Sequence, residues 1–397
     1  MMSSLLKIMN EMIRRSYPLL SNTTMRILSE ADVRRCLPIS AAIAANKKAL
    51  SSLQSNGDGG ATVPTRIGLP YHSKESHSTI PAPADWSLFK PAAYYPSQQQ
   101  DNSDNTDTEI LMGVKVVSPR ANNASKNKPT CPATIMLLNA ETGEISAVVA
   151  ATFLTAARTA AGSALATEIA CSGSEANTNG LTLVVFGAGL QGELHIKAIQ
   201  HVVNVKKVVI VNKSKERAGK LKESLLSIDE TDIDLESKTR NPVKDISIVL
   251  LSDKEAVQQS VETADVIVTA TNTCEPLFPG DWPKPGCHIN GVGSYTPLMK
   301  EIDDSLVSRS EVLIDTKEAL DVGDLSALRN DDGTTKQNFT GMIGDALTSN
   351  VEFGKRTDNN VDCTFFKSVG TAIQDVITAQ LVYDYATKEG IGTTIDM

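Results

Sequence analysis

The hydrophobic pattern changes character near the middle of the chain. Before residue 172, short apolar runs alternate with helical segments; after Gly180, buried runs and amphipathic helices follow one another. In the first part, Ser29 is a suitable N-cap for a helix that starts at Glu30, and residues 40–53 form a second helical segment. Three strand patterns follow over residues 62–71, 110–119 and 133–151. The last is two strands joined at a Glu-Thr-Gly turn.

An alanine-rich helix is predicted over residues 153–170, with Thr155 as its N-cap and Arg158 in its first turn. A cation at that point opposes the helix dipole, which favours anions. Either Arg158 is a solvated charge, or it joins the free N–H groups of the first turn in holding an anion.

From Gly180 onward the pattern predicts a parallel sheet covered on both faces. Residues 181–202 are a buried strand, a glycine turn and a helix, and residues 206–227 supply a second strand and helix. Further short apolar runs cover residues 246–251, 264–271, 286–293 and 311–316. The end, residues 363–389, has helical spacing throughout and is predicted as one long helix.

Composition narrows the function classes. The chain has 397 residues, 41% of them hydrophobic, which is enough for two domains, and its net charge of −9 argues against a nucleic-acid or anionic-membrane surface. Six scattered cysteines (36, 131, 171, 274, 287 and 363) fit a reducing compartment, and the five histidines show no zinc-ligand spacing, so no metal site is predicted. No run reaches the ~20 apolar residues of a membrane helix.

Gly187, Gly189 and Gly192 form G-x-G-x-x-G between a strand and a helix, with Leu190 and Gln191 inside the motif. In this context the motif indicates a dinucleotide site: one glycine makes the tight turn, one admits a pyrophosphate and one lets helix and strand pack closely. The alternative is a purely structural glycine turn.

The residues after the second strand bear on the choice of dinucleotide. An NAD site usually presents an acid there to the ribose 2′-hydroxyl. This chain has Asn212, Lys213 and Ser214 instead, and a lysine beside a serine suits a 2′-phosphate. NADP(H) is therefore the preferred cofactor and NAD(H) remains possible; Lys213 is otherwise a solvated charge.

Five segments together resemble the ornithine cyclodeaminase/mu-crystallin family: LTAARTAAGSALAT, VVFGAGLQGELH, VNKS, DWPKPGCHINGVGSYTP and FFKSVGTAIQD. The resemblance implies an α/β fold in which a central Rossmann NAD(P)-binding domain is inserted in an α+β substrate and dimerisation domain. The expected divisions are an extension over 1–24, the first part of the substrate domain over 25–160, the Rossmann domain over 161–315, and a returning segment over 316–397.

The resemblance also assigns residues. It places Arg66, Lys115 and Arg158 around a substrate carboxylate, which guanidinium groups bind with paired hydrogen bonds. Lys115 is also expected to donate a hydrogen bond or a proton at the imine nitrogen. Other positions implied by the family are Val369 at the substrate and Thr271, Val292, Ser368 and again Arg158 at the cofactor. A homodimer is implied in the same way.

Two positions depart from the family pattern. Gly293-Ser294-Tyr295 stands where ornithine cyclodeaminases and alanine dehydrogenases have a catalytic aspartate, and Tyr295 is a much weaker base. Cys131-Pro132 stands where many relatives have His-Gln. Asp375 is expected to be a solvated or capping acid, and His195 and His288 are expected to be packing residues.

The leading hypothesis is an NAD(P)H-dependent reductase of small ketimino acids, such as pyrroline- or piperideine-2-carboxylate. Arg66, Lys115 and Arg158 fix the carboxylate, and Lys115, Tyr295 or water handles the proton. The alternatives are ornithine cyclodeamination, alanine dehydrogenation, and NADPH and ligand binding without turnover. The expected location is the cytoplasm, or an organelle if residues 1–24 are a transit peptide; the imine is left open.

Overall fold

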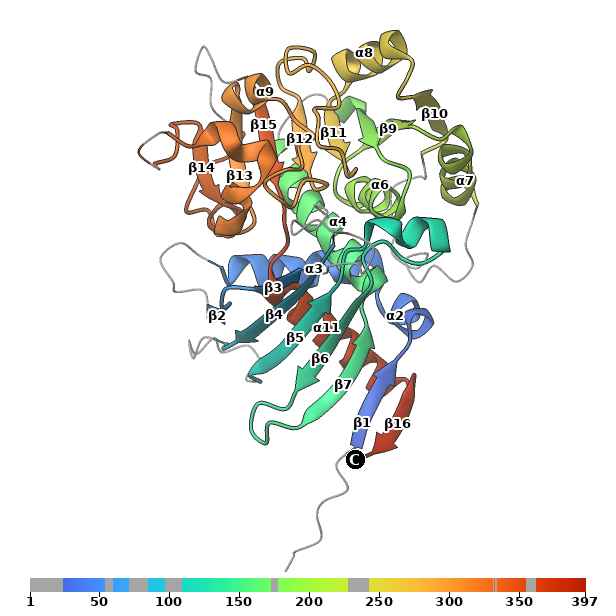
Figure 1. Cartoon of the computed structure of the whole chain (residues 1–397), viewed down its shortest axis with the longest axis vertical. Coiled ribbons are helices and arrows are strands. Elements are labelled where there is room, and N and C mark those ends of the chain that lie inside the picture. The colour runs from blue at the N-terminus through green and yellow to red at the C-terminus, as the bar shows by residue number, and fades with distance from the viewer. Residues whose placement is uncertain are drawn as a thin grey trace, which may run out of the picture.

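The computed structural model places two sheets one above the other, with the long helix α4 (Thr152–Ala170) running between them (Figure 1). It describes residues 24–53, 60–70, 85–96, 109–172, 178–227, 243–330, 332, 334–354 and 362–397. Residues 1–23 of the predicted extension and the polar residues 97–108 lie outside the described residues, whereas Thr24, its last residue, begins a strand. No helix within the described ranges is long and apolar enough to cross a membrane.

The first sheet is mixed and carries the N-terminal part of the chain. Its order is β16-β1-β7-β6-β5-β4-β2, with β3 also pairing to β4. The strands are β1 (Thr24–Leu28), β2 (Ala61–Thr62), β3 (Ile67–Pro70), β4 (Trp86–Tyr94), β5 (Leu111–Val117), β6 (Ala133–Leu138), β7 (Ile145–Ala150) and β16 (Thr393–Asp396). Helices α2 (Glu30–Cys36), α3 (Ile39–Ser51) and α11 (Ala372–Lys388) pack with this part, and a 3-10 helix, η1, covers Ala121–Lys126.

The second sheet is parallel throughout, in the order β10-β9-β8-β11-β12-β15-β13-β14. Its strands are β8 (Leu181–Phe186), β9 (Val205–Asn212), β10 (Asp245–Leu250), β11 (Val266–Thr269), β12 (His288–Gly291), β13 (Ser310–Ile314), β14 (Phe339–Met342) and β15 (Cys363–Lys367). Its helical elements are α6 (Leu190–Val202), α7 (Lys215–Leu226), α8 (Lys254–Thr263), α9 (Asp304–Ser308), α10 (Ile343–Leu347), η3 (Lys317–Asp321) and η4 (Gly323–Leu328). The α/β prediction is confirmed.

The predicted helix over residues 363–389 is wrong in its first third. Residues Cys363–Lys367 are β15, inserted between β12 and β13, and the helix α11 begins only at Ala372. A short run of buried apolar residues cannot be assigned by periodicity alone, and the two neighbouring strands decide it here. The segment 316–397 is therefore divided between the two sheets. Strands β14 and β15 belong to the second sheet, whereas α11 and β16 pack with the first.

The predicted start of the alanine-rich helix is also wrong. Helix α4 spans Thr152–Ala170, and its N-cap is Ala151, which makes no side-chain cap. Thr155 lies inside the helix, so Arg158 sits in the second turn, away from the free N–H groups. By contrast, Ser29 caps α2 as predicted, in a capping box with Asp32.

The strand predicted over residues 62–71 is broken. It forms the two short strands β2 and β3, and Arg66 lies in the irregular stretch between them rather than in a strand. Pro64 cannot donate a ladder hydrogen bond, which agrees with a break at this point.

Helix α4 is buried nearly all round, which explains its composition. Fourteen residues from Phe153 to Thr167 are buried, and six of them are alanine. Small side chains let α3, α6 and α11 approach closely: a Cβ on Gly162 would lie 3.3 Å from the Gln374 amide nitrogen of α11. The helix therefore fixes the second sheet against the first.

We expect the fold to lose stability as the pH falls from about 6.5 to 4. His195 and His288 are packing residues, as predicted, and burial lowers the pKa of each to about 4. The unfolded chain binds these two protons near pH 6.5, whereas the folded chain binds them only near pH 4. The free energy of unfolding therefore falls as the pH falls between these values. Urea unfolding against pH measures this. The slope of the unfolding free energy against pH should approach about 2.7 kcal/mol per pH unit, the value for the uptake of two protons. An unfolding free energy that does not change between pH 6.5 and 5 would contradict the prediction.

Candidate functional site

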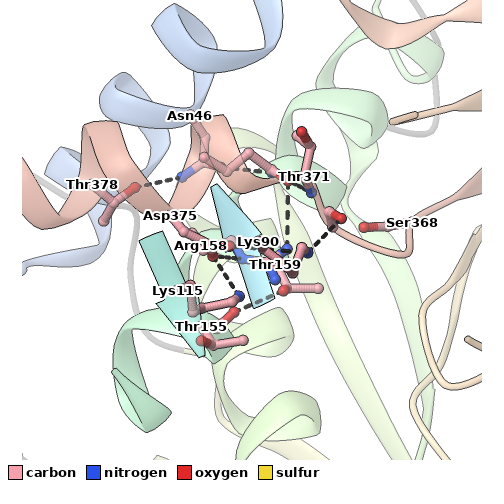
Figure 2. Close-up of polar contacts among 12 residues, drawn as sticks. Asn46, Lys90, Lys115, Thr155, Arg158, Thr159, Ser368, Thr371, Asp375 and Thr378 are labelled. Atoms are coloured by element: carbon pink, nitrogen blue, oxygen red, sulfur yellow. Dashed lines mark hydrogen bonds and ion pairs between the residues drawn. The ribbon is translucent and has the colours of Figure 1, made fainter. Parts of the chain in front are cut away.

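A buried carboxylate, Asp375 on α11, is the centre of the site (Figure 2). Its Oδ1 accepts from Lys115 Nζ at 2.7 Å and from Arg158 Nε at 2.9 Å. Its Oδ2 is buried and has no hydrogen-bond partner among the residues that the structure describes, and Lys90 Nζ lies 4.0 Å away. Burial alone would raise the pKa of Asp375, but the charges of Arg158, Lys115 and Lys90 outweigh it and lower the pKa. Asp375 is therefore an ionised carboxylate.

Two buried lysines face Asp375 from neighbouring strands. Lys90 on β4 and Lys115 on β5 lie directly opposite each other in the antiparallel register, where like charges normally destabilise a sheet. Burial, opposed by the charge of Asp375, lowers the pKa of Lys90 to about 8 and that of Lys115 well below its usual value. With Arg158 these lysines give three cations against the carboxylates of Asp375 and Asp315, whose charge also acts on Lys90, and the remaining positive charge favours a negatively charged ligand.

Arg158 has unused hydrogen-bonding capacity. The residue is 4% exposed; its Nε donates to Asp375, and its Nη1 lies 3.4 Å from the Gln374 side-chain oxygen. Within the described ranges, Nη2 has no hydrogen-bond acceptor. A guanidinium held on one edge by a carboxylate still offers its other N–H groups to a ligand carboxylate.

The turn between β15 and α11 closes the site on the side of the second sheet. The Asp315 carboxylate accepts from the Ser368 hydroxyl and from the backbone N–H groups of Val369 and Gly370, and the Gly370 carbonyl accepts from Lys90 Nζ at 2.8 Å. Gly370 has φ +76°, and a Cβ there would lie 2.2 Å from Arg158 Nη1. Both conditions require glycine at this position.

Electrostatic interactions link two other residues assigned to the substrate and the proton to this centre, Arg66 through Lys90 and Tyr295 through Cys131. Arg66 is half-buried and contributes to the lowered pKa of Lys90. Tyr295 is half-buried; burial chiefly, with the charges of Cys131 and Asp85, raises its pKa. Burial raises the pKa of Cys131, and the charge of Lys115 partly opposes this effect. Tyr295 therefore keeps its proton at neutral pH.

The glycine motif has the geometry of a phosphate-binding turn. A Cβ on Gly187 would lie 2.5 Å from the Ala270 carbonyl oxygen, and one on Gly192 would lie 2.1 Å from the Gly187 oxygen, whereas Gly189 faces open space. Gly189 is the N-cap of α6 and provides no side-chain cap. The Gln191 side-chain oxygen is buried and has no hydrogen-bond partner within the described part of the chain. An uncapped helix terminus behind glycines fits a dinucleotide pyrophosphate.

The end of β9 lies beside this turn. The Asn212 side-chain oxygen accepts from Ala188 N, which ties the glycine turn to β9, and its amide donates to the Ser214 carbonyl. The Ser214 hydroxyl caps α7 by accepting from Arg217 N. Lys213 is exposed. Asn212 and Ser214 thus shape the turn, and Lys213 is free to move toward a ligand.

Loops at the carboxyl ends of β11, β12 and β15 carry the other residues assigned to the cofactor. Thr271 follows β11, Val292 follows β12, and Ser368 follows β15, and these three strands are neighbours in the sheet. Ligands of open parallel sheets bind at this edge. The structure therefore brings these three positions to one side of the second sheet, next to the glycine turn after β8.

Sequence reasoning missed two residues of the centre. Asp375 was expected to be solvated or capping, yet it is 0% exposed and holds the cations; its place on α11 gave no signal, because its partners are more than 200 residues away. Lys90 did have a signal: a lysine inside the apolar run WSLFKPAAY of β4. An unexplained charge in a buried strand indicates a partner elsewhere.

The parallel sheet, the glycine turn and the strand-edge loops define a Rossmann-type dinucleotide-binding protein with a cationic site beside the dinucleotide turn. Comparison with known proteins gives the family. Residues 103–254 and 251–390 match the model of the ornithine cyclodeaminase/mu-crystallin family, and the chain belongs to that family.

Three relatives illustrate its range. The chain is 32% identical over 390 residues to an uncharacterized cyclodeaminase of Dictyostelium discoideum, covering 94% of this chain and 100% of the relative. It is 31% identical to a Delta(1)-pyrroline-2-carboxylate reductase of Bacillus thuringiensis, covering 72% and 80%. The structure of the Thermococcus litoralis Delta(1)-pyrroline-2-carboxylate reductase in complex with NADH and L-proline matches with a TM-score of 0.74 at 26% identity, covering 94% and 100%.

Proposed function

We propose that this protein is an NAD(P)H-dependent reductase of small cyclic ketimino acids such as pyrroline-2-carboxylate or piperideine-2-carboxylate. The observation that carries the proposal is the buried set of Lys90, Lys115 and Arg158 around the single carboxylate of Asp375, next to a dinucleotide turn. Its excess positive charge suits a substrate carboxylate. The reductases among the relatives support the choice of reaction.

The bound nicotinamide supplies a hydride to the imine carbon. The protein's part is to place that carbon and to deliver a proton. Arg158, through its free guanidinium edge, and Arg66 hold the substrate carboxylate, which fixes the ring against the strand-edge loops. Burial by α11 and the two lysine-bearing strands keeps water away from these contacts and strengthens them.

Lys115 provides the proton to the nitrogen. Its ammonium is held by Asp375 at 2.7 Å, and its lowered pKa makes it a better acid than an ordinary lysine. Tyr295, with its raised pKa, stays protonated. Ornithine cyclodeaminases use an aspartate as acid/base in deamination, and Tyr295, a poor base, stands at that position here, which favours imine reduction.

The test is NADH and NADPH consumption by the purified protein with each of the two cyclic imines, next to ammonia release from ornithine with NAD. We expect imine-dependent consumption and no ammonia. Ammonia and proline from ornithine without imine reduction would replace the proposal with cyclodeamination. Cofactor and ligand binding without turnover of any imine would favour a binding protein.

We further propose that NADPH is preferred over NADH, on the basis of the exposed Lys213 at the end of β9. Replacing Lys213 with Glu puts a negative charge beside a 2′-phosphate, so the KM for NADPH should rise about tenfold or more while the KM for NADH stays near its original value. Lys215→Glu, two residues on, is the control. Equal changes for both cofactors would contradict the preference.

We also propose that the outer face of the first sheet pairs with a second copy of the chain. Gly113 and Lys115 of β5 face α11, whereas Met112, Val114 and Val116 alternate onto the opposite face, which is uncovered in Figure 1. An apolar sheet face of this kind is typical of an interface.

Val114→Asp should therefore give a folded monomer, because a charge at the centre of such an interface is desolvated without a partner. Light scattering after gel filtration measures the mass, and Ser224→Asp on the exposed side of α7 is the control. A monomeric parent protein, or a Val114→Asp dimer, would overturn the proposed interface.

A further inference from the structure

One buried carboxylate outside the cationic site joins two of the strand-edge loops. Glu301 is 0% exposed, and its Oε1 accepts from the backbone N–H and the hydroxyl of Thr271, at 2.6 and 2.7 Å. Its Oε2 accepts from the Thr269 hydroxyl at 2.9 Å and from Gly293 N at 2.7 Å. Four donors from the ends of β11 and β12 therefore converge on one side chain.

The backbone of Glu301 is itself held in place. Asp324 Oδ1 accepts from the N–H groups of Glu301 and Ile302, and Asp324 Oδ2 accepts from Lys367 Nζ at 2.8 Å. Lys367 is the last residue of β15, so the chain of contacts reaches the loop after a third strand. Asp324 and Lys367 are each 0% exposed.

The packing around Gly293 shows how closely the two loops approach. A Cβ at Gly293 would lie 2.0 Å from the Thr271 carbonyl oxygen and 2.4 Å from Glu301 Oε1. The loops after β11 and β12 are thus in direct contact around the carboxylate, with no room for a side chain between them.

We infer that Glu301 is a positioning residue for the nicotinamide half of the cofactor. It fixes the loops after β11 and β12 at the edge of the sheet, the side on which Thr271, Val292 and Tyr295 lie, while the glycine turn after β8 holds the pyrophosphate. The inference rests on the proposed nicotinamide cofactor. It assigns to Glu301 no contact with the substrate or the reacting atoms.

The test is Glu301→Gln. An amide replaces one acceptor oxygen with an NH₂ group, so in either orientation one backbone N–H, that of Thr271 or that of Gly293, loses its acceptor. An unpaired buried donor loosens the loop it belongs to. The Kd of NADH and NADPH, measured by the change in nicotinamide fluorescence, should rise about tenfold or more. The Kd of ADP-ribose and of its 2′-phosphate, which lack nicotinamide, should stay within about twofold of the parent protein.

Glu311→Gln is the matched control. Glu311 is a buried glutamate of β13 that accepts from Gly354 N and the Thr340 hydroxyl, near the opposite end of its strand. The Glu311→Gln variant should lower thermal stability without changing the Kd of the dinucleotides or that of the ADP-ribose compounds. If Glu301→Gln does not fold, Thr271→Val, which removes a single hydroxyl donor, should shift the Kd of the dinucleotides in the same direction.

If Glu301→Gln weakened the binding of ADP-ribose and of NADH equally, the inference would be overturned. Unchanged binding of both ligands would overturn it as well. Failure of the parent protein to bind any nicotinamide dinucleotide is a different result, since it would refute the proposed function itself.

Discussion

Lys115→Met should reduce kcat/KM for the imine by about 10³-fold or more, because the substitution removes a general acid and one of the cations around the substrate carboxylate. Met is close to Lys in length and suits a buried site, so the fold should persist. The measurement is steady-state reduction of pyrroline-2-carboxylate, with the Kd of NADPH as the internal reference, because Lys115 contacts Asp375 and not the dinucleotide turn.

Two results would distinguish the role of Lys115 as proton donor from its role as a ligand of the substrate carboxylate. A loss confined to KM would leave Lys115 as a carboxylate ligand and remove it as the proton donor. Full activity in Lys115→Met would show that neither role is correct. Parallel measurements on Lys90→Met show whether the second buried lysine, held at 2.8 Å by the Gly370 carbonyl, acts in the same step.

Asp375→Asn is expected to have the second large effect. It leaves Lys90, Lys115 and Arg158 buried without their shared anion, and breaking a buried ion pair from one side typically costs about 3–5 kcal/mol. Activity should also change its pH dependence. Asp375 raises the pKa of Lys115, so without it Lys115 loses its proton at lower pH, and the alkaline limb of the rate profile should move to lower pH.

Asp384→Asn, on the exposed side of the same helix, is the control for changes to α11. If Asp375→Asn does not fold, Asp375→Glu keeps the charge and should retain the parent pH profile with reduced activity. An Asp375→Asn variant with parent stability and an unmoved alkaline limb would contradict the assignment of Asp375 as the shared anion.

Periodicity and turn chemistry determined most of the second sheet. The buried run before Gly187, the three glycines and the strand ending at Asn212 were all predicted in place. These signals are local: a glycine turn is specified by the few residues that form it, and a buried parallel strand by a short apolar run. The same holds for the capping box at Ser29.

The resemblance to the family added Arg66, Lys115 and Arg158, and the structure brings Lys115 and Arg158 to one carboxylate. The sequence by itself did not find that carboxylate. Asp375 is 260 residues from Lys115 and 217 from Arg158, so its role depends on α11 packing across β4 and β5.

Tertiary structure also decided where elements begin and what they join. Residues Cys363–Lys367 follow a helical pattern, yet β12 and β13 leave a place for a strand between them, and these residues fill it. Helix α4 starts three residues before the predicted cap at Thr155, and the acceptor for the Phe153 N–H in its first turn is the Glu30 carboxylate of α2, which is distant in sequence. Local sequence fixed the dinucleotide turn, which needs only its own backbone. The cationic centre and the Glu301 contacts arise from segments brought together by packing, and no short-range pattern encodes them.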